Sequence, residues 1–293
     1  MFEHLVISGG GHSFFQMLGI FKQLFDGNIV DKKKLVSIYS TSSGSIISIL
    51  LSLPLEWSLI TSYCLERPWQ KIFKLDIEQL YCLFNKKGIY NITHITQALK
   101  PIFDCADISL DISLQDFFTL TNVEHHFFSF EVNSFVIKDI NYKSYPDIKL
   151  LVALQMTCAL PFIFEPVYKD DMCFIDGGIT SNFPIEFCTT ENPSKSILGI
   201  RNEYVKHATV NVTEKTNVFD FLLTFIFKLL SILRKPPYVS KSYTEIVSPC
   251  LPISIDLLQK SIHNMEFRKQ LFKEGLECGA SFVENHPKDA SKN

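Results

Sequence analysis

The chain has 293 residues, of which 46% are hydrophobic and 20% are charged, a composition that suits one large α/β domain or two small ones with ample core. The formal net charge of -3 gives no global basic field, so a nucleic-acid partner is not expected. The 26 phenylalanines indicate either a deep apolar pocket or a surface that contacts lipid.

The N-terminal part of the chain predicts two strand–turn–helix units. Residues 4–8 predict a short buried strand, which a glycine turn connects to a helix over 13–26 that ends at Gly27-Asn28. Residues 35–40 predict a second strand, and residues 43–53 predict a helix that ends before Pro54. Each unit brings the end of a strand directly to the start of a helix.

The remaining chain continues this alternation. The predicted elements are a helical stretch over 56–80 broken near Pro68, a helix over 91–103 with Thr93 as a possible cap, strands within 126–145, a helix over 147–160, strands at 172–176 and 196–200, and a mostly helical remainder. Strands that alternate with helices predict a mainly parallel sheet with helices on both faces. No repeat, low-complexity linker or convincing domain boundary interrupts the sequence.

The glycine turn, Ser8-Gly9-Gly10-Gly11-His12, lies between the first strand and the first helix. Backbone N–H groups in such a turn can bind an anion, either a phosphate or a developing oxyanion. A tight packing turn explains the same glycines equally well. The segment lacks the lysine of a P-loop, and Phe14 stands where G-x-G-x-x-G has its last glycine, so we rank a nucleotide site last.

The segment S-T-S-S-G at 40–44 places Ser42 at the turn between the second strand and its helix. Such an elbow exposes a serine hydroxyl beside the N–H groups of a helix N-terminus. Gly44 allows strand and helix to approach closely, but Ser40 stands where the usual G-x-S-x-G pattern has glycine, and a positive φ at Ser40 would cost strain. The alternative is that Ser42, Ser43 and Ser45 only cap the helix.

Asp176-Gly177-Gly178 closes the strand predicted at 172–176. The carboxyl end of a strand is where α/β folds place their sites, although an ordinary Asp-Gly turn also explains the dipeptide. No histidine stands in a loop typical of a catalytic triad, but His207 and His263 follow Asp176, so chain order does not exclude them. An aspartate acting directly on serine needs a pKa raised by burial.

Taken together, these segments resemble the patatin-like phospholipase family. The resemblance includes KKGIYNITHITQALKPIF at 86–103 and ALQMTCALPFIFEPVYKDDMCFIDGGITSNFPIE at 153–186. The second segment is similar to the family block A-S-x-A-x-P-x-x-F-x-P…DGG…N-x-P, with Thr157 in place of its serine. The resemblance covers residues 4–200 and implies a three-layer α/β/α fold with a mainly parallel central sheet. We expect residues 201–293 to form a mostly helical extension packed on the same domain.

The resemblance also implies an activity and the residues that perform it. The family cleaves fatty acyl esters of lipids, as a phospholipase A does, through a Ser–Asp dyad and an acyl-enzyme. Carried over, Ser42 is the nucleophile and Asp176 the general base. Gly9, Gly10 and Gly11 supply the backbone N–H groups of an oxyanion hole. The resemblance implies no cofactor, and the sequence shows no calcium site, so we predict a metal-independent reaction.

Two positions depart from the family pattern. Ser40 replaces the elbow glycine, and after the oxyanion loop Ser13 and Phe14 replace a basic residue and a glycine. The lost cation removes a side chain that anchors the loop or attracts anionic headgroups, but it leaves the backbone donors in place. The departures leave open a second function, a weakly active or inactive lipid-binding protein with the same fold.

Residues 218–233, VFDFLLTFIFKLLSIL, are nearly all apolar. The stretch is shorter than the roughly 20 residues that cross a bilayer, although flanking residues could extend it. It predicts a buried helix that roofs the acyl pocket, an interfacial helix that makes peripheral contact with a membrane, or a membrane span. Each alternative suits a substrate that is a phospholipid or another acyl lipid.

The eight cysteines are scattered, without a C-x-x-C pair or the Cys/His spacing of a zinc site. The N-terminus lacks the basic and apolar segments of a signal peptide. We therefore expect reduced thiols and a cytoplasmic protein that is not secreted, peripheral on membranes if residues 218–233 contact lipid.

Overall fold

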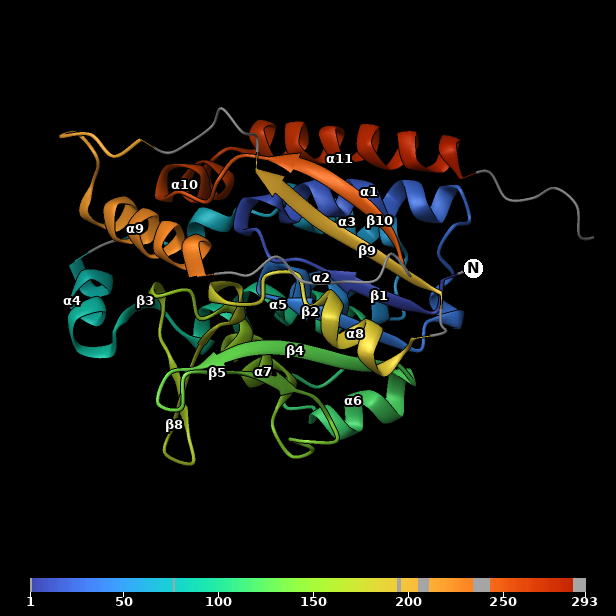
Figure 1. The fold of residues 1–293 in the computed structure, drawn as a ribbon, viewed down its shortest axis with the longest axis horizontal. Helices are drawn as coiled ribbons and strands as arrows, with labels where there is room; N and C mark the ends of the chain where they lie inside the picture. Colours follow the sequence, from blue (N-terminus) through green and yellow to red (C-terminus); the bar gives the residue numbers. More distant parts are fainter. Residues whose placement is uncertain (1, 76, 194–195, 205–210, 234–242, 287–293) are drawn as a thin grey trace, which may run out of the picture.

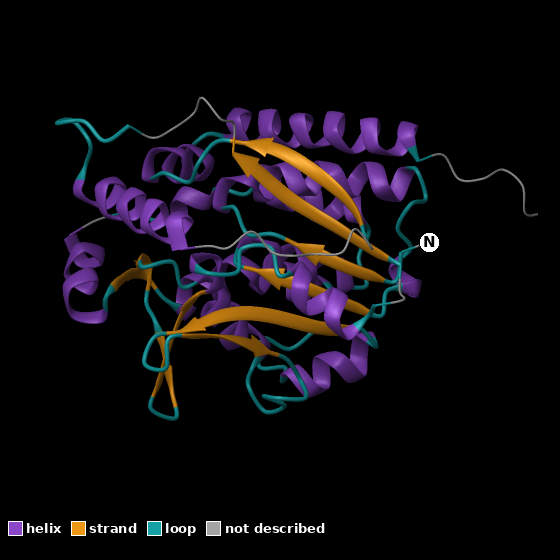
Figure 2. Ribbon diagram, viewed as in Figure 1, coloured by secondary structure: helices purple, strands orange, loops and turns teal. Residues whose placement is uncertain are grey.

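The computed structural model describes all residues except 1, 76, 194–195, 205–210, 234–242 and 287–293. Within the described residues, a central eight-stranded sheet carries helices on both faces (Figures 1 and 2), which confirms the predicted α/β architecture. Its parallel strands are, in spatial order, β10 (Thr244–Cys250), β9 (Ile197–Tyr204), β1 (His4–Ile7), β2 (Ser37–Thr41) and β4 (Glu124–Glu131). Antiparallel strands complete the sheet: β8 (Met172–Asp176), β7 (Val167–Lys169) and β5 (Val136–Ile140).

The two faces of the sheet belong to different cores. In β1, Leu5 and Ile7 enter the larger core, whereas Val6 enters the smaller core on the opposite face. In β2, Ile38 and Tyr39 divide in the same way. Because successive side chains of a strand point to opposite faces, these central strands must be apolar on both sides.

Helices cover the two faces unequally. The smaller core lies under α8 (Ile185–Glu191), which contributes Ile185 and Cys188. The larger core receives side chains from α1 (Phe14–Asp26), α2 (Ser43–Ser52), α3 (Trp57–Glu66), α5 (Ile92–Cys105), α6 (Leu114–Thr121), α7 (Leu150–Cys158) and α11 (Met265–Asn285).

A third, smaller group of elements lies beyond the carboxyl ends of the parallel strands. Its apolar cluster includes Ile89, Tyr90 and Ile163, with Phe219 and Ile255 packed against it. The elements concerned are α4 (Ile77–Lys86), β3 (Gly88–Tyr90), β6 (Phe162–Phe164), α9 (Val218–Leu233) and α10 (Ile255–His263). Strands β3 and β6 pair with each other in a separate two-stranded sheet.

The C-terminal part of the chain differs from the prediction at β10. This strand forms an edge of the central sheet, whereas the sequence predicted a mostly helical remainder. Pro249 lies within the strand, and a proline makes a run of residues look unsuitable for a strand unless it lies at a sheet edge. The central sheet therefore continues past residue 200, where the predicted patatin-like region ends. Beside the sheet, α11 packs against α1.

The cap of α5 also differs from the prediction. The sequence indicated Thr93 as the possible cap, but Asn91 performs this function, because its side chain accepts a hydrogen bond of 3.1 Å from the backbone N–H of Thr93. The ring of His94 accepts in return from the backbone N–H of Asn91 at 3.2 Å. The two bonds form a capping box in which histidine takes the place of the usual Glu or Gln.

Candidate active site

The turn at Ser42 joins β2 to α2 with strained backbone geometry. Ser42 has φ 53° and ψ -128°, in a region that residues other than glycine rarely adopt. Such a conformation costs about 1–3 kcal/mol. Ser42 occupies the N-cap position of α2, but its side chain makes no capping hydrogen bond. A simple helix cap therefore does not explain Ser42, whereas a strained strand-to-helix elbow does.

The structure shows why a serine is tolerated at position 40. Ser40 lies inside β2, pairs with Ile7 on one side and Phe127 on the other, and is not among the residues with positive φ. Its hydroxyl donates a long hydrogen bond, 3.4 Å, to the backbone carbonyl of His126. The positive φ of the elbow falls at Ser42, so the side chain at position 40 costs no backbone strain.

Gly44, by contrast, has no room for a side chain. A Cβ at this position would lie 2.6 Å from the carbonyl oxygen of Ser8 and 2.7 Å from that of Ile7. Both atoms are backbone, so neither can move aside easily. The start of α2 thus approaches β1 as closely as the sequence predicted.

Asp176 lies at the end of β8, and the register of the sheet places it level with the elbow. Thr41 is level with Phe128 in β4, and the next residue of β4, Ser129, pairs with Asp176. This register brings Ser42 and Asp176 close together, and the hydroxyl of Ser42 favours the ionised form of the Asp176 carboxyl and so lowers its pKa. The N–H of Gly178 donates a hydrogen bond of 2.7 Å to the same carboxylate.

Burial controls the acidity of Asp176. Only 3% of this residue is exposed, and the loss of water raises the pKa of its carboxyl group from 3.8 to about 6, against the opposing effects of the Ser42 hydroxyl and the Gly178 N–H. A carboxylate with this pKa is ionised at neutral pH but is a stronger base than an ordinary aspartate.

Among the described residues, no histidine takes the position of Asp176 beside Ser42. His207 lies outside the described residues, and His263 ends α10. The ring of His12, next to the glycine turn, is buried, and desolvation lowers its pKa to about 4, so it is neutral. The titratable side chain that lies beside Ser42 is therefore an aspartate.

The glycine turn lies directly against the elbow. A Cβ on Gly9 would lie 2.9 Å from the Cβ of Ser42. The N–H of Gly9 donates to the carbonyl of Asn182 at 3.1 Å, and the N–H of Gly10 donates to the hydroxyl of Ser43 at 3.0 Å. Gly11 has φ +55°, in the left-handed region that favours glycine.

The donors available to a ligand therefore differ among these residues. The N–H groups of Gly9 and Gly10 are already hydrogen-bonded to other groups of the protein. For Gly11 and Ser43, both at the cavity beside Ser42, no backbone acceptor or side-chain acceptor receives the N–H among the described residues. Ser43 is the first residue of α2, where N–H groups have no partner inside the helix.

Two asparagines anchor the glycine turn. The carbonyl of Gly9 accepts hydrogen bonds from the side-chain amides of Asn182, at 3.1 Å, and Asn202, at 2.9 Å. The same amide of Asn202 donates to the hydroxyl of Ser13 at 2.7 Å. Ser13 stands at the position of the missing basic residue, so here a network of neutral groups holds the loop. Sequence reasoning missed Asn202, although its place near the carboxyl end of the strand SILGI was a usable signal.

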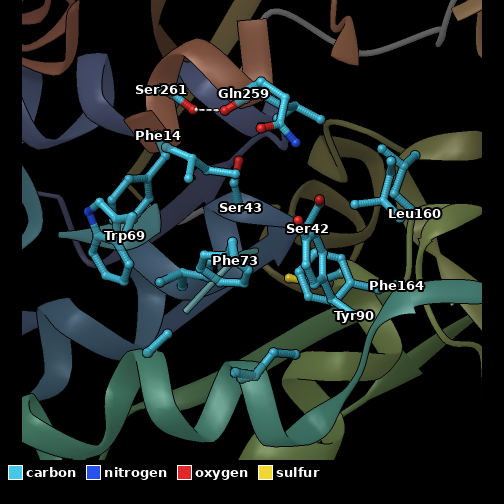
Figure 3. Close-up of a pocket in the computed structure, with 18 of the residues that line it drawn as sticks. Phe14, Ser42, Ser43, Trp69, Phe73, Tyr90, Leu160, Phe164, Gln259 and Ser261 are labelled. Carbon is cyan, nitrogen blue, oxygen red and sulfur yellow. Dashed lines mark hydrogen bonds between the residues drawn. The ribbon is translucent and has the colours of Figure 1, made fainter. Parts of the chain in front are cut away.

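A cavity of about 280 Å³ opens at Ser42 and Ser43. Figure 3 shows Trp69, Phe73, Tyr90 and Phe164 around it, and Phe14 also contributes its ring. Phe14 replaces a family glycine, and its side chain adds apolar surface to this wall. The lining is almost entirely apolar, which suits a hydrocarbon chain.

Helices α9 and α10 close one side of this cavity. Phe219 and Ile255 contribute to its lining. The buried carboxylate of Asp220 accepts a hydrogen bond of 2.8 Å from the N–H of Ile255, which joins α9 to the N-terminus of α10. One face of α9 thus covers the cavity, while Phe221 and Phe225 on another face are exposed. Among the described helices, none combines the length and apolar character that a membrane crossing requires.

Comparison with known proteins supports the fold and the family. Residues 5–189 match the family described as patatin-like phospholipase. An uncharacterized protein of Acanthamoeba polyphaga mimivirus is 26% identical over 297 residues, which cover 96% of this chain and 92% of that protein. A protein of Invertebrate iridescent virus 6 named "Probable lipid hydrolase" is 25% identical over 197 residues, covering 67% of this chain and 66% of that protein.

A solved structure confirms the architecture. The crystal structure of VipD from Legionella pneumophila matches with a TM-score of 0.55 and 14% sequence identity, over 97% of this chain and 67% of VipD. Identity this low carries information about the fold alone. The predicted patatin-like fold is correct.

Replacing Asp176 with asparagine is expected to stabilise the protein above pH 6. The pKa of this carboxyl is higher in the folded protein than in the unfolded chain, so its ionised form opposes folding. This cost is absent below about pH 3.8, grows as the pH rises to about 6, and is then fully present. It corresponds to about 3 kcal/mol at most. Asp176→Asn should therefore raise the free energy of unfolding at pH 7.5 but not at pH 4, measured by urea denaturation.

The matched control is Asp147→Asn, the same chemical change at an exposed position. It should leave stability unchanged at both pH values. Equal effects of the two variants, or a gain for Asp176→Asn that is the same at pH 4 and pH 7.5, would contradict the assigned pKa.

Proposed function

Because the chain belongs to the patatin-like phospholipase family, we propose that it is a lipid acyl hydrolase in which Ser42 is the nucleophile and Asp176 the general base. The observation that carries this proposal is the placement of a serine on a strained elbow next to a buried aspartate of raised pKa, beside an apolar cavity. The viral relative named as a probable lipid hydrolase supports the same reaction class.

Acylation follows from this arrangement. The Asp176 carboxylate takes the hydroxyl proton of Ser42, and Oγ attacks the carbonyl carbon of an ester whose acyl chain lies in the cavity. The carbonyl oxygen becomes an oxyanion next to the N-terminus of α2. The tetrahedral intermediate collapses, the alcohol leaves with the proton from Asp176, and an acyl group remains on Ser42.

Deacylation repeats the same steps with water. Asp176 takes a proton from a water molecule, and the resulting hydroxide attacks the acyl carbonyl carbon. The second tetrahedral intermediate releases the fatty acid as the proton returns to Oγ of Ser42. The reaction consumes one water and produces one fatty acid and one alcohol, and the residues return to their starting state.

We assign the oxyanion donors to the N–H groups of Gly11 and Ser43. In an elbow of this kind, one donor is the residue after the nucleophile, which is Ser43 here. Gly11 supplies the second from the glycine turn. Gly10 fixes the hydroxyl of Ser43, and Gly9 leaves the space that lets the turn lie against Ser42. Each such donor contributes about 3–4 kcal/mol to the transition state.

The departures from the family pattern do not favour the alternative of an inactive lipid-binding protein. Ser40 lies in regular strand geometry, and Ser13 takes part in the network that anchors the loop. Phe14 lines the cavity. None of these three side chains disturbs the pair of Ser42 and Asp176.

We also propose that the protein contacts lipid surfaces through the exterior of α9 and the region of α4. Phe221 and Phe225 of α9 are exposed, as are Leu75 and Phe84 near and on α4. Leu75 also lines the cavity, so the exposed apolar surface continues to the proposed acyl site. Exposed apolar groups of this kind favour insertion at a membrane interface.

Hydrolysis of a soluble ester such as 4-nitrophenyl octanoate tests the chemistry. Ser42→Ala and Asp176→Asn should each lower kcat/KM by about a thousandfold, whereas Ser62→Ala, an exposed serine on α3, should retain full activity. The base must be ionised, so wild-type kcat/KM should rise with pH and level off above a pKa near 6. Retained activity in Ser42→Ala, or a rate that does not change between pH 5 and pH 8, would contradict the assignment.

Vesicle sedimentation tests the lipid contact separately. In a Ser42→Ala background, Phe221→Gln with Phe225→Gln should weaken binding to phosphatidylcholine vesicles by about tenfold or more, because two large apolar side chains no longer enter the interface. Leu120→Gln, equally exposed but on α6, is the matched control and should bind normally. Equal binding of all these proteins would exclude α9 as the contact.

A further inference from the structure

The last turn of α7 contacts both residues of the proposed pair. The hydroxyl of Thr157 accepts a hydrogen bond of 2.9 Å from the backbone N–H of Ser42. Two residues later, the backbone carbonyl of Ala159 accepts one of 3.0 Å from the N–H of Asp176. A single turn of chain thus holds the backbone of the nucleophile and the backbone of the base.

The hydroxyl of Thr157 has a fixed orientation. It is completely buried and donates its own proton to the backbone carbonyl of Phe128 at 2.6 Å. Because that proton is committed, the remaining lone pairs of the hydroxyl face the N–H of Ser42, with Ser45 at 3.5 Å as a further neighbour. The same carbonyl oxygen of Phe128 leaves no room for a side chain at Gly177, because a Cβ there would lie 2.2 Å from it.

The N–H of Ser42 needs this acceptor. Ser42 follows the last residue of β2 and precedes the first residue of α2, so neither the strand ladder nor the helix offers it a carbonyl. Without Thr157, a donor at a buried junction would lose its partner, in a residue whose φ is already unfavourable. Rotation of the backbone out of the strained conformation would then lower its free energy.

We propose that Thr157 is a positioning residue that holds Ser42 in its strained conformation, so that Oγ stays directed at Asp176. This inference rests on the proposed function of Ser42 and Asp176. The family block has serine at this position, and threonine keeps the hydroxyl that the role requires. The hydroxyl, rather than the size or shape of the side chain, is the property that matters.

The first test compares Thr157→Val, which keeps the shape and removes the hydroxyl, with Thr157→Ser, which keeps the hydroxyl. In ester hydrolysis, Thr157→Val should lower kcat by about 10- to 100-fold with little change in KM, because the acyl cavity is intact while the nucleophile is displaced. Thr157→Ser should retain activity close to wild type. Ser45→Ala is the matched control and should also remain active, because it removes only the hydroxyl next to Thr157 and keeps the backbone hydrogen bond from the Ser45 N–H to the Ser42 carbonyl.

A purely structural role predicts a different pattern. In that case Thr157→Val would lower the melting temperature, and below that temperature its folded fraction would have the kcat of wild type. Wild-type kcat in folded Thr157→Val would overturn the proposal. Should that variant not fold, Thr157→Ala takes its place, with the same two outcomes.

The second test does not depend on catalysis. Native-state hydrogen exchange should show that the Ser42 amide of wild type and of Thr157→Ser is protected, and that Thr157→Val loses this protection. Rapid exchange of the Ser42 amide in wild type would overturn the proposal without any variant. A protected amide in a protein that hydrolyses no ester would instead disprove the proposed function and leave the positioning contact in place.

Discussion

The strained backbone at Ser42 is the constraint on which the rest of the site depends. A non-glycine residue with positive φ persists only when its surroundings fix it. Here the close approach of Gly44 to β1 fixes the start of α2, and Gly9 packs against the Ser42 side chain. Thr157 satisfies the Ser42 N–H. The elbow, the glycine turn and the end of α7 therefore form one interlocked unit, and the free energy that maintains the strain comes from the buried sheet behind it.

The burial of Asp176 is the second constraint, and it has opposite consequences for folding and for chemistry. Removing water from the carboxylate raises its pKa and thereby makes it a better base for a serine hydroxyl. The same desolvation makes the ionised protein less stable than a neutral substitute would be. The burial of Asp176 within the protein maintains the low-dielectric environment that both effects require. In the proposed mechanism, Asp176 therefore activates Ser42 without a histidine.

The sequence was informative wherever a local pattern decides the structure. The apolar runs and glycine turns located the strands and the Ser42 turn, and the ordered motifs identified the family. It failed where distant contacts decide. β10 contains a proline and became a strand because it pairs with β9. The roles of Asn202 and Thr157 depend on side-chain contacts that no spacing encodes, and so does the engagement of the Gly9 and Gly10 N–H groups.

The central claim is that Ser42 is an activated nucleophile, and a fluorophosphonate probe tests it most directly. Intact-mass analysis of the purified protein should show a single adduct on wild type and none on Ser42→Ala. Two results would contradict the account: an adduct that persists in Ser42→Ala, or no adduct on well-folded wild type while a control serine hydrolase in the same experiment is labelled. The first would place the reactive group elsewhere, and the second would leave a lipid-binding protein with the fold of a hydrolase.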